Sequence, residues 1–291
     1  MTAPDQAIAP AMASRSMLSL VGVIDIGSNS IRLVVFEDGV RSPDYFFNEK
    51  VICGLGRGLG ATGRLNPEGK DAARATLRRF VSLARRMGVT EIIAFATAAL
   101  REAEDGPEFR DELSGALDLS IRVLAGVEEA RLAAEGVLFG WPAARGVIAD
   151  LGGASLELAV VEGGEALAGV SVPAGHLLLG EAETELSRRA LQALSAAAQP
   201  FAKRASRLIL VGGAWRALAK AGMARGGYPL HVLQGFEMTP EVANGLCDWA
   251  LSETPEAIKK AAGVSNSRIP SMTGGARALK RLLADLKPGV V

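Results

Sequence analysis

The stretches "IDIGSNSIRL", residues 24–33, and "ADLGGASLEL", residues 149–158, decide the fold of this chain. Each is an apolar strand that reaches an acid, turns through Gly and Ser residues and continues as a second apolar strand, which is the pattern of a β-hairpin. The two copies align at a constant offset of 125 residues. The matched pairs are Asp25 with Asp150, Gly27 with Gly152, Ser30 with Ser155, Leu33 with Leu158, Val35 with Val160, Glu37 with Glu162 and Gly39 with Gly164. A duplicated hairpin predicts two related domains, each opened by one copy.

Composition agrees with two α/β domains. The 291 residues are 49% apolar and only 5% aromatic, with 34 glycines, which suits aliphatic cores between helices and sheets. Lys and Arg number 32 and Asp and Glu also number 32, so no net field gathers nucleic acid or an anionic membrane. We therefore expect neither as a partner.

The chain shows no sign of export. Residues 1–18 lack a basic segment followed by an apolar one, so we expect a disordered lead-in rather than a signal peptide. No stretch is apolar and uncharged over the roughly 18 residues that a membrane helix needs. Cys53 and Cys247, the only cysteines, are too few for a disulfide framework. These features predict a cytoplasmic protein.

Helices and strands alternate after each hairpin. In the first half, Asn66 and Pro67 predict a helix start and Gly88 its stop, after a glycine-rich connector. A strand from 90 that runs into a small-residue turn, a helix over 106–117, a strand over 121–126 and a helix over 127–140 follow. The second half predicts a hairpin over 146–161, helical structure over 176–206, strand, glycine turn and helix over 207–221, helices over 240–251 and 255–263, and a glycine turn with a helix over 271–286. This order predicts mixed sheets packed by helices.

Three glycine-rich turns, at 25–30, 150–155 and 211–213, follow apolar strands. Glycine lets backbone N–H groups converge on an anion, and an Asp at the strand end can hold a divalent cation against a bound phosphate. Two such hairpins facing one another would form a phosphoryl-transfer cleft. The alternative is two tight hairpins whose Asp residues cap their own turns.

Six ordered motifs carry a resemblance to a known family. "VIDIGSNSIRLVV", "CGLGRGLGATGRL", "AFATAALREA", "GVEEARLAAEGV", "IADLGGASLEL" and "LVGGAWRAL" resemble the exopolyphosphatase and guanosine pentaphosphate phosphohydrolase family. The resemblance implies an α/β fold of two actin-like (ribonuclease H-like) domains, each with a mixed β-sheet flanked by helices, and an active site in the cleft between them. We expect domain I over residues 19–135 and domain II over 136–291.

The same resemblance implies a Mg²⁺-dependent phosphohydrolase. Its substrate would be inorganic polyphosphate or guanosine pentaphosphate, and Glu129, in "EEAR", would activate water against the terminal phosphoryl group. Asp25, Asp150 and Glu157 resemble the acids associated with the metal, although Glu157 could instead be the outward residue of an alternating strand. A homodimer is also implied.

Phosphate-binding residues follow from the same motifs. They are Ser28, Asn29 and Ser30 in the first loop, Gly152, Gly153, Ala154 and Ser155 in the second, and Arg101 in "ATAALREA". Arg101 could equally be a solvated helix-start arginine, and Lys50 and Arg32 are weaker candidates. His176 and His231 have no partners at metal spacing, so we expect them in the core or on the surface.

Ala154 departs from the family pattern, which has a third glycine there. If this position has positive φ, the Cβ costs on the order of 1–2 kcal/mol. That expectation motivates a second hypothesis, a phosphate or nucleotide sensor in which Ala154 has disabled turnover. A third hypothesis is a kinase or ATPase of the same superfold, which "EEAR" and "ATAALREA" disfavour.

Overall fold

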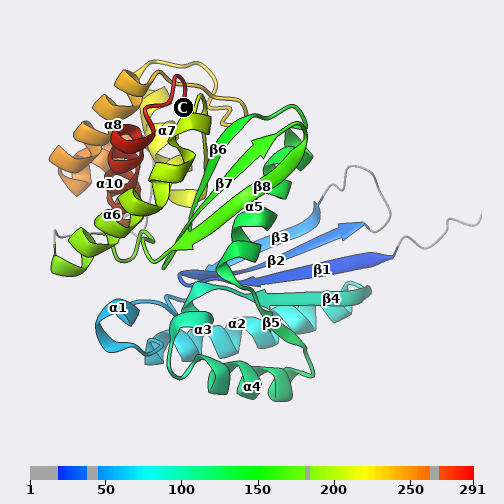
Figure 1. Ribbon diagram of the computed structural model, residues 1–291. Helices are drawn as coiled ribbons and strands as arrows, with labels where there is room; N and C mark the ends of the chain where they lie inside the picture. Colours follow the sequence, from blue (N-terminus) through cyan, green and yellow to red (C-terminus); the bar gives the residue numbers. More distant parts are fainter. Residues whose placement is uncertain (1–18, 38–44, 181–183, 263–268) are drawn as a thin grey trace, which may run out of the picture.

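The computed structural model describes residues 19–37, 45–180, 184–262 and 269–291 (Figure 1). The predicted lead-in 1–18 and the paired Gly39 lie outside these residues. Two β-sheets form the two halves of the molecule, and helix α5 (Gly126–Gly140) connects them. No helix among the described residues is long and apolar enough to cross a membrane.

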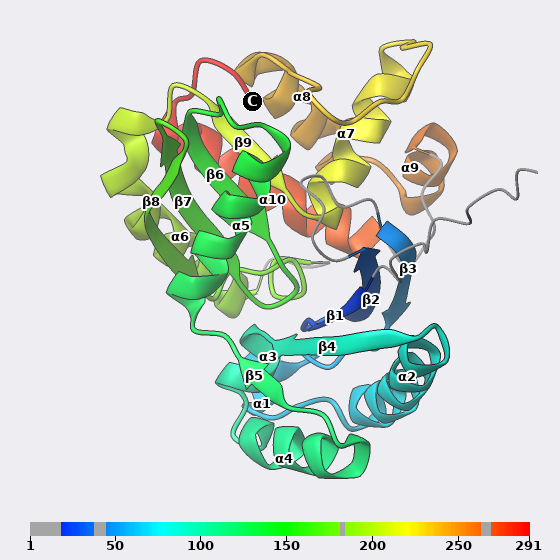
Figure 2. The ribbon, with the colours of Figure 1, turned by 90° about the vertical axis from the view of Figure 1, so that its right-hand side faces the viewer.

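The first sheet has five strands and begins with the first predicted hairpin. Its order is β3 (Tyr45–Ile52), β2 (Ser30–Glu37), β1 (Leu20–Ile26), β4 (Val89–Ala96) and β5 (Ile121–Val123). β1, β2 and β3 pair antiparallel, whereas β4 and β5 are parallel to β1. Figure 2 shows the helices of this half gathered on one side of the sheet: α1 (Leu59–Thr62), α2 (Pro67–Arg86), α3 (Ala98–Glu102) and α4 (Gly106–Leu117).

The second sheet has four strands and begins with the second predicted hairpin. Its order is β8 (Glu165–Val172), β7 (Leu156–Glu162), β6 (Gly146–Leu151) and β9 (Leu208–Val211). Helix α5 covers one face. The other face carries the remaining elements: α6 (Glu185–Ala198), the 3₁₀ helix η1 (Gln199–Arg204), α7 (Gly213–Arg225), α8 (Pro240–Ser252), α9 (Pro255–Ala262) and α10 (Ile269–Leu286).

The position of β7 in the sheet buries one acidic side chain, that of Glu157, in the core. Helices cover both faces of this inner strand, so all its side chains are buried except the last. A strand covered on both faces is apolar at nearly every position, as "LELAVV" is, and does not alternate. Glu157 is the exception in this run and is only 5% exposed.

The predicted fold class, two mixed β-sheets flanked by helices, is confirmed. The predicted bounds of α2 are also confirmed: the helix starts at Pro67 and ends before Gly88, where φ is 77°. Three local predictions were incomplete or wrong. The sequence reading missed β3, placing its end in a glycine-rich connector, and missed β8 altogether. It also placed a glycine turn at Gly274 and Gly275, which instead lie inside α10.

All of α5 packs along the second sheet. The expected boundary between residues 135 and 136 falls within this helix. We propose that domain II, as a packing unit, begins at α5. The helix then carries its first-turn acids, Glu128 and Glu129, from domain II toward the first half.

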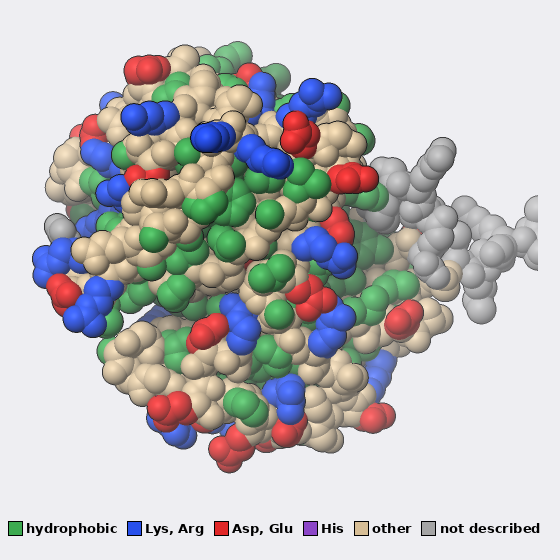
Figure 3. Space-filling view, viewed as in Figure 1, with side chains coloured by type: hydrophobic (Ala, Val, Ile, Leu, Met, Phe, Trp, Pro, Cys, Tyr) green, Lys and Arg blue, Asp and Glu red, His purple; other side chains and the backbone are tan. Residues whose placement is uncertain are grey.

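Figure 3 shows one face of the molecule, on which basic and acidic side chains are interspersed. This arrangement agrees with equal numbers of acidic and basic residues in the sequence.

Candidate active site

The two glycine turns have the same internal geometry. In the first hairpin the Gly27 amide donates to the Ser30 carbonyl at 3.0 Å, and in the second the Gly152 amide donates to the Ser155 carbonyl at 3.0 Å. The sequence repeat is therefore a structural repeat, down to one matched hydrogen bond.

The two turns face each other. A Cβ built on Gly153 would lie 3.0 Å from the Asn29 backbone nitrogen and 3.0 Å from the Ser28 Cβ. Glycine at 153 therefore lets the loops of the two halves meet. Since each loop follows a strand that carries an Asp, this contact brings Asp25 and Asp150 near one another, and each hairpin contributes to one shared site.

Neighbouring segments hold the loop carbonyls. In the first loop, the Ser28 carbonyl accepts from the Gly56 amide at 2.7 Å. In the second, the amides that hold the carbonyls come from the turn after β8: His176 donates to Gly152 at 3.0 Å, Leu177 to Gly153 at 2.9 Å and Gly175 to Ala154 at 3.0 Å. Hydrogen bonds from neighbouring segments thus hold the backbone carbonyls of both loops in place.

This tethering orients the amides. In a trans peptide the C=O and the following N–H point in opposite directions, and the described residues contain no cis peptide bond. The N–H groups of Asn29, Gly153, Ala154 and Ser155 therefore point away from the tethering segments. None of these four donates a hydrogen bond within the described residues. Free backbone amides in facing glycine-rich loops are groups that can bind an anion.

Side chains in these loops have structural partners. The Ser28 hydroxyl accepts from the Ala99 amide at 3.1 Å, in the first turn of α3, and Ser28 is only 3% exposed. The Ser155 hydroxyl is hydrogen-bonded to Glu157 and is also buried. Because both hydroxyl groups are already hydrogen-bonded within the protein, we expect these loops to contact phosphate through their backbone amides.

The pKa values of Asp25 and Asp150 are both raised toward neutral pH. Burial raises the pKa of Asp25 to about 6; Lys50 and Arg32 lower it, whereas the charge of Asp150 raises it. Burial likewise raises the pKa of Asp150 to about 6, opposed by Arg216. Both groups are mainly carboxylates at pH 7, and a cation between them would be stabilised.

Glu129 is positioned by Arg101. The Arg101 guanidinium pairs with the Glu129 carboxylate through Nη1, which also donates to the Leu124 carbonyl at 2.8 Å, while Nε donates to Glu102 at 2.9 Å. Burial raises the pKa of Glu129, Arg101 opposes this, and the charges of Asp25 and Asp150 raise it further. Glu129 therefore lies within electrostatic reach of both hairpin acids.

Glu157 has a different environment. Its carboxyl group accepts a hydrogen bond from the Ser171 hydroxyl at 2.7 Å and is also hydrogen-bonded to the Ser155 side chain. Burial and then the charge of Glu129 raise its pKa to about 8, so this carboxyl is mostly protonated at pH 7. It lies inside the sheet and not on an outward face, which excludes the alternative of an exposed alternating residue.

The structure also brings in residues to which the sequence assigned no role in the site or, for Lys50, only a weaker one. His176 is buried, and burial followed by the charge of Lys50 lowers its pKa to about 4. Lys50, on β3, thus acts on both Asp25 and His176. Arg216 lies in the quoted "LVGGAWRAL" motif, but only the fold shows that it acts on Asp150. We found no sequence signal for His176.

The expectation of positive φ at Ala154 was wrong. Among the described residues, the non-glycine residues with positive φ are Asp118 and Lys287. A Cβ at position 154 is therefore unstrained, and the second loop does not require a third glycine.

The described residues offer carboxylate oxygens as metal ligands, but they do not form a complete set of protein ligands for a metal ion. Asp25 and Asp150 supply carboxylates of the kind Mg²⁺ prefers. In the described part of the chain, no group of three or more His, Cys, Asp or Glu side chains is arranged to hold a metal ion. Mg²⁺ is often bound by one or two carboxylates, with water and substrate phosphate completing the shell.

Comparisons with known proteins identify relatives of this chain. Exopolyphosphatase 1 of Mycobacterium leprae is 32% identical over 159 residues, and its namesake in Mycobacterium tuberculosis (strain ATCC 25618 / H37Rv) is 31% identical. These matches cover 53% of this chain and 47% and 46% of the relatives, so the chain matches about half of their length.

Solved structures share the fold. An exopolyphosphatase from Cytophaga hutchinsonii superposes with a TM-score of 0.81 at 22% identity, covering 94% of this chain and 92% of that chain. The Ppx/GppA family member from Aquifex aeolicus gives a TM-score of 0.74 at 23% identity, with the same coverage. These structures place both halves of the chain in the two-domain, actin-like fold.

The sequence model of the Ppx/GppA phosphatase family matches residues 33–291. That range contains Glu129 and the whole second hairpin, but only the last part of β2 from the first hairpin. The duplicated turns, the fold and this match together show that the chain belongs to the Ppx/GppA phosphatase family.

Proposed function

We propose that this chain is a Mg²⁺-dependent phosphohydrolase that releases orthophosphate from the end of a phosphoanhydride chain. The observation that carries the proposal is the close approach of the two loops, in which the amides of Asn29, Gly153, Ala154 and Ser155 donate to no group among the described residues. Phosphoryl transfer depends mainly on positioning and on neutralising charge, and these loops supply both.

Glu129 would activate the attacking water. Its carboxylate accepts a proton from water as the water oxygen bonds to the terminal phosphorus, and the bond from that phosphorus to the bridging oxygen breaks. Arg101 holds the carboxylate in place and opposes the rise in its pKa that burial causes. A positioned general base of this kind contributes roughly 10²–10⁴-fold to the rate.

Asp25 and Asp150 would hold Mg²⁺ between the hairpins. Bound there, the ion would neutralise charge on the phosphate oxygens. Because Glu157 is protonated at pH 7 and bonded to Ser155 and Ser171, we assign it to supporting the second loop rather than to binding the metal directly.

The substrate we favour is inorganic polyphosphate, because the mycobacterial relatives are named exopolyphosphatases. Guanosine pentaphosphate offers the same terminal phosphoanhydride and is the second candidate. The sensor hypothesis loses its motivation, since Ala154 is unstrained. A homodimer and a cytoplasmic location remain predictions.

The test is phosphate release from long-chain polyphosphate and from guanosine pentaphosphate, with Mg²⁺ and with EDTA. We expect Glu129→Gln to lose at least about 100-fold in kcat, because glutamine keeps the shape but cannot accept the proton. Glu128→Gln is the matched control, one residue away and paired with Arg122 outside the site. Equal activity of Glu129→Gln and wild type would contradict the proposed base.

A further inference from the structure

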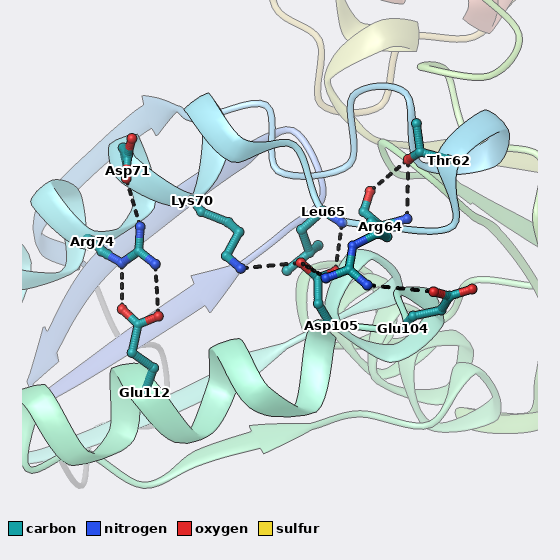
Figure 4. Close-up of polar contacts among 9 residues, drawn as sticks. All are labelled: Thr62, Arg64, Leu65, Lys70, Asp71, Arg74, Glu104, Asp105 and Glu112. Carbon is teal, nitrogen blue, oxygen red and sulfur yellow. Dashed lines mark hydrogen bonds and ion pairs between the residues drawn. The ribbon is translucent and has the colours of Figure 1, made fainter.

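Helices α2 and α4 pack side by side under the first sheet, and acids balance the basic side chains of α2 along only part of their contact (Figure 2). In the first part, the Lys70 ammonium pairs with Asp105 at 3.2 Å, and Arg74 Nη2 donates to Glu112 at 2.8 Å (Figure 4). Arg78 is the next basic residue on the same face of α2. The last four residues of α4 are Ser, Gly, Ala and Leu, so this helix offers no acid there.

A groove of about 520 Å³ lies between the C-terminal ends of the two helices. Arg78, Arg85 and Arg86 of α2 line one side of it, and residues from the end of α4 line the other. Gly115 leaves this side open, because a Cβ built on it would meet no atom within 4 Å. The small residues at the end of α4 therefore both remove acidic partners and make room for a ligand.

The groove carries an excess of positive charge. Among the described residues, none of its three arginines lies within 4 Å of a carboxylate oxygen; Arg85 instead donates to the Leu117 carbonyl at 3.2 Å. Asp118 is the one carboxylate in the described lining, and it forms no ion pair there. Glu112 lies within electrostatic reach of Arg78 but already belongs to the ion pair described above. Three arginines against one aspartate leave two positive charges for an anion to neutralise.

Helix stability explains only part of this cluster. Arg85 and Arg86 lie in the last turn of α2, where positive charge stabilises the C-terminus of a helix. Arg78 lies two turns earlier, where that effect has fallen off. The guanidinium groups of Arg78 and Arg86 are exposed and make no hydrogen bond among the described residues. Planar guanidinium groups of this kind bind phosphate oxygens through paired hydrogen bonds.

Helix α2 connects this groove with the candidate active site. A Cβ on Gly69, in its first turn, would lie 2.9 Å from the Gly54 carbonyl oxygen, and the Gly54 amide donates to the Asn29 carbonyl of the first phosphate loop at 2.9 Å. At a rise of 1.5 Å per residue, the 20 residues of α2 extend about 30 Å, and Arg78 lies about halfway along. Tripolyphosphate is too short to span this separation, whereas a long phosphate chain can.

We propose that the groove lined by Arg78, Arg85 and Arg86 binds a distal stretch of the polyphosphate chain whose end is hydrolysed between the two hairpins. This inference rests on the proposed function and adds a second contact that only long chains make. The arginines would form charge-assisted hydrogen bonds with phosphate oxygens, and this binding would weaken as salt rises. Because the contact is remote from the reacting phosphorus, it would lower KM and leave kcat unchanged.

The double variant Arg78→Ala/Arg86→Ala tests the groove by steady-state phosphate release. We expect its KM for long-chain polyphosphate to rise about tenfold and to depend less steeply on salt, with kcat and the KM for tripolyphosphate unchanged. Its Tm should match wild type, because both side chains are exposed. Arg188→Ala/Arg189→Ala on α6 removes the same charge from exposed positions in the other half and is the matched control.

Gly115→Glu is a second variant that keeps both arginines. It places a carboxylate in the groove without overlap, since a Cβ there meets no atom, and should raise the same KM. Calorimetry with long-chain polyphosphate in EDTA measures binding without turnover, and both groove variants should bind more weakly than wild type and the α6 control.

The outcomes separate this inference from the proposed function. Weaker long-chain binding by the groove variants alone would support the groove even if the chain hydrolysed nothing. Normal activity with equal long-chain KM and affinity in wild type, both groove variants and the control would overturn the groove alone. An equal loss for tripolyphosphate and long chains would also overturn it, and no binding of long-chain polyphosphate by wild type would overturn both proposals.

Discussion

Single residues set the shape of the candidate site, and Gly153 is the clearest case. A Cβ at this position would lie only 3.0 Å from the Asn29 backbone nitrogen, so a larger residue would push the two loops apart. The neighbouring position, Ala154, does not require glycine, since its φ is not positive. Two adjacent small residues thus have different roles, which sequence alone did not separate.

Ala154→Gly should therefore change kcat/KM for polyphosphate by less than about threefold. A glycine there would relieve no strain and would add some flexibility to the unfolded chain. Steady-state phosphate release checks this. A gain of tenfold or more would restore the hypothesis that Ala154 limits turnover.

Gly175→Ala should damage the second phosphate loop. A Cβ there would lie 2.3 Å from the Gly153 carbonyl oxygen and 2.3 Å from the Ala154 carbonyl carbon, so backbone must move. Overpacking of this kind costs about 1–3 kcal/mol, and we expect a lower Tm with at least tenfold less activity. Gly136→Ala on α5 meets no atom within 4 Å and is the control. Unchanged Tm and activity in Gly175→Ala would contradict the loop packing.

At the scale of elements, a buried ion pair supports the region that carries Arg101. Figure 4 shows Asp105, at the start of α4, beside Leu65 and Lys70; its carboxylate accepts from the Leu65 amide at 2.9 Å and from the Lys70 ammonium at 3.2 Å. Burial raises the pKa of Asp105, but these partners outweigh burial and hold it below its usual 3.8. The pair ties α4 to α2 just after Arg101.

Asp105→Ala should lower the free energy of unfolding by about 3 kcal/mol, because it leaves a buried amide and an ammonium without their partner. The folded pKa is depressed, so the contribution of Asp105 is complete above its ordinary pKa and is lost as the pH falls through the folded value. The difference between wild type and variant should therefore shrink below about pH 4. Urea unfolding at pH 7 and at lower pH measures this.

Asp111→Ala is the control for Asp105→Ala, because that side chain is 67% exposed and pairs only with its neighbour Arg110 among the described residues. It should cost less than about 0.5 kcal/mol. Equal stability of the two variants at pH 7 would contradict the role of Asp105.

The sequence predicted elements well where local signals were strong and poorly where packing decided. Capping and proline signals located α2 within a residue or two. β3 was missed because it is an edge strand interrupted by three consecutive polar residues, Asn48, Glu49 and Lys50, and it runs into a glycine-rich connector. Glycines predicted a turn at 274–275, yet Gly274 meets the His176 backbone and Gly275 meets Trp215, whose Nε1 donates to the Gly275 carbonyl at 2.9 Å. Close helix packing, invisible in one sequence, explains those glycines.

At the scale of the whole molecule, the repeat predicted the most important feature, two related halves with matching turns. It could not predict that the turns touch, nor that Arg101 pairs with Glu129, because both contacts join segments that the chain brings together only in the folded state. The same limit applies to His176, whose amide donates to the Gly152 carbonyl of the second loop at 3.0 Å.

The central claim is that two hairpins form one phosphate site. The most direct test is a titration of the ¹⁵N-labelled protein with tripolyphosphate and Mg²⁺, following the amides of Asn29 and Ala154. We predict that both amides shift along a single binding curve with one Kd, while the Gly163 amide, in the distal turn between β7 and β8, does not shift. Movement of only one loop, or two curves with different Kd values, would contradict a shared site.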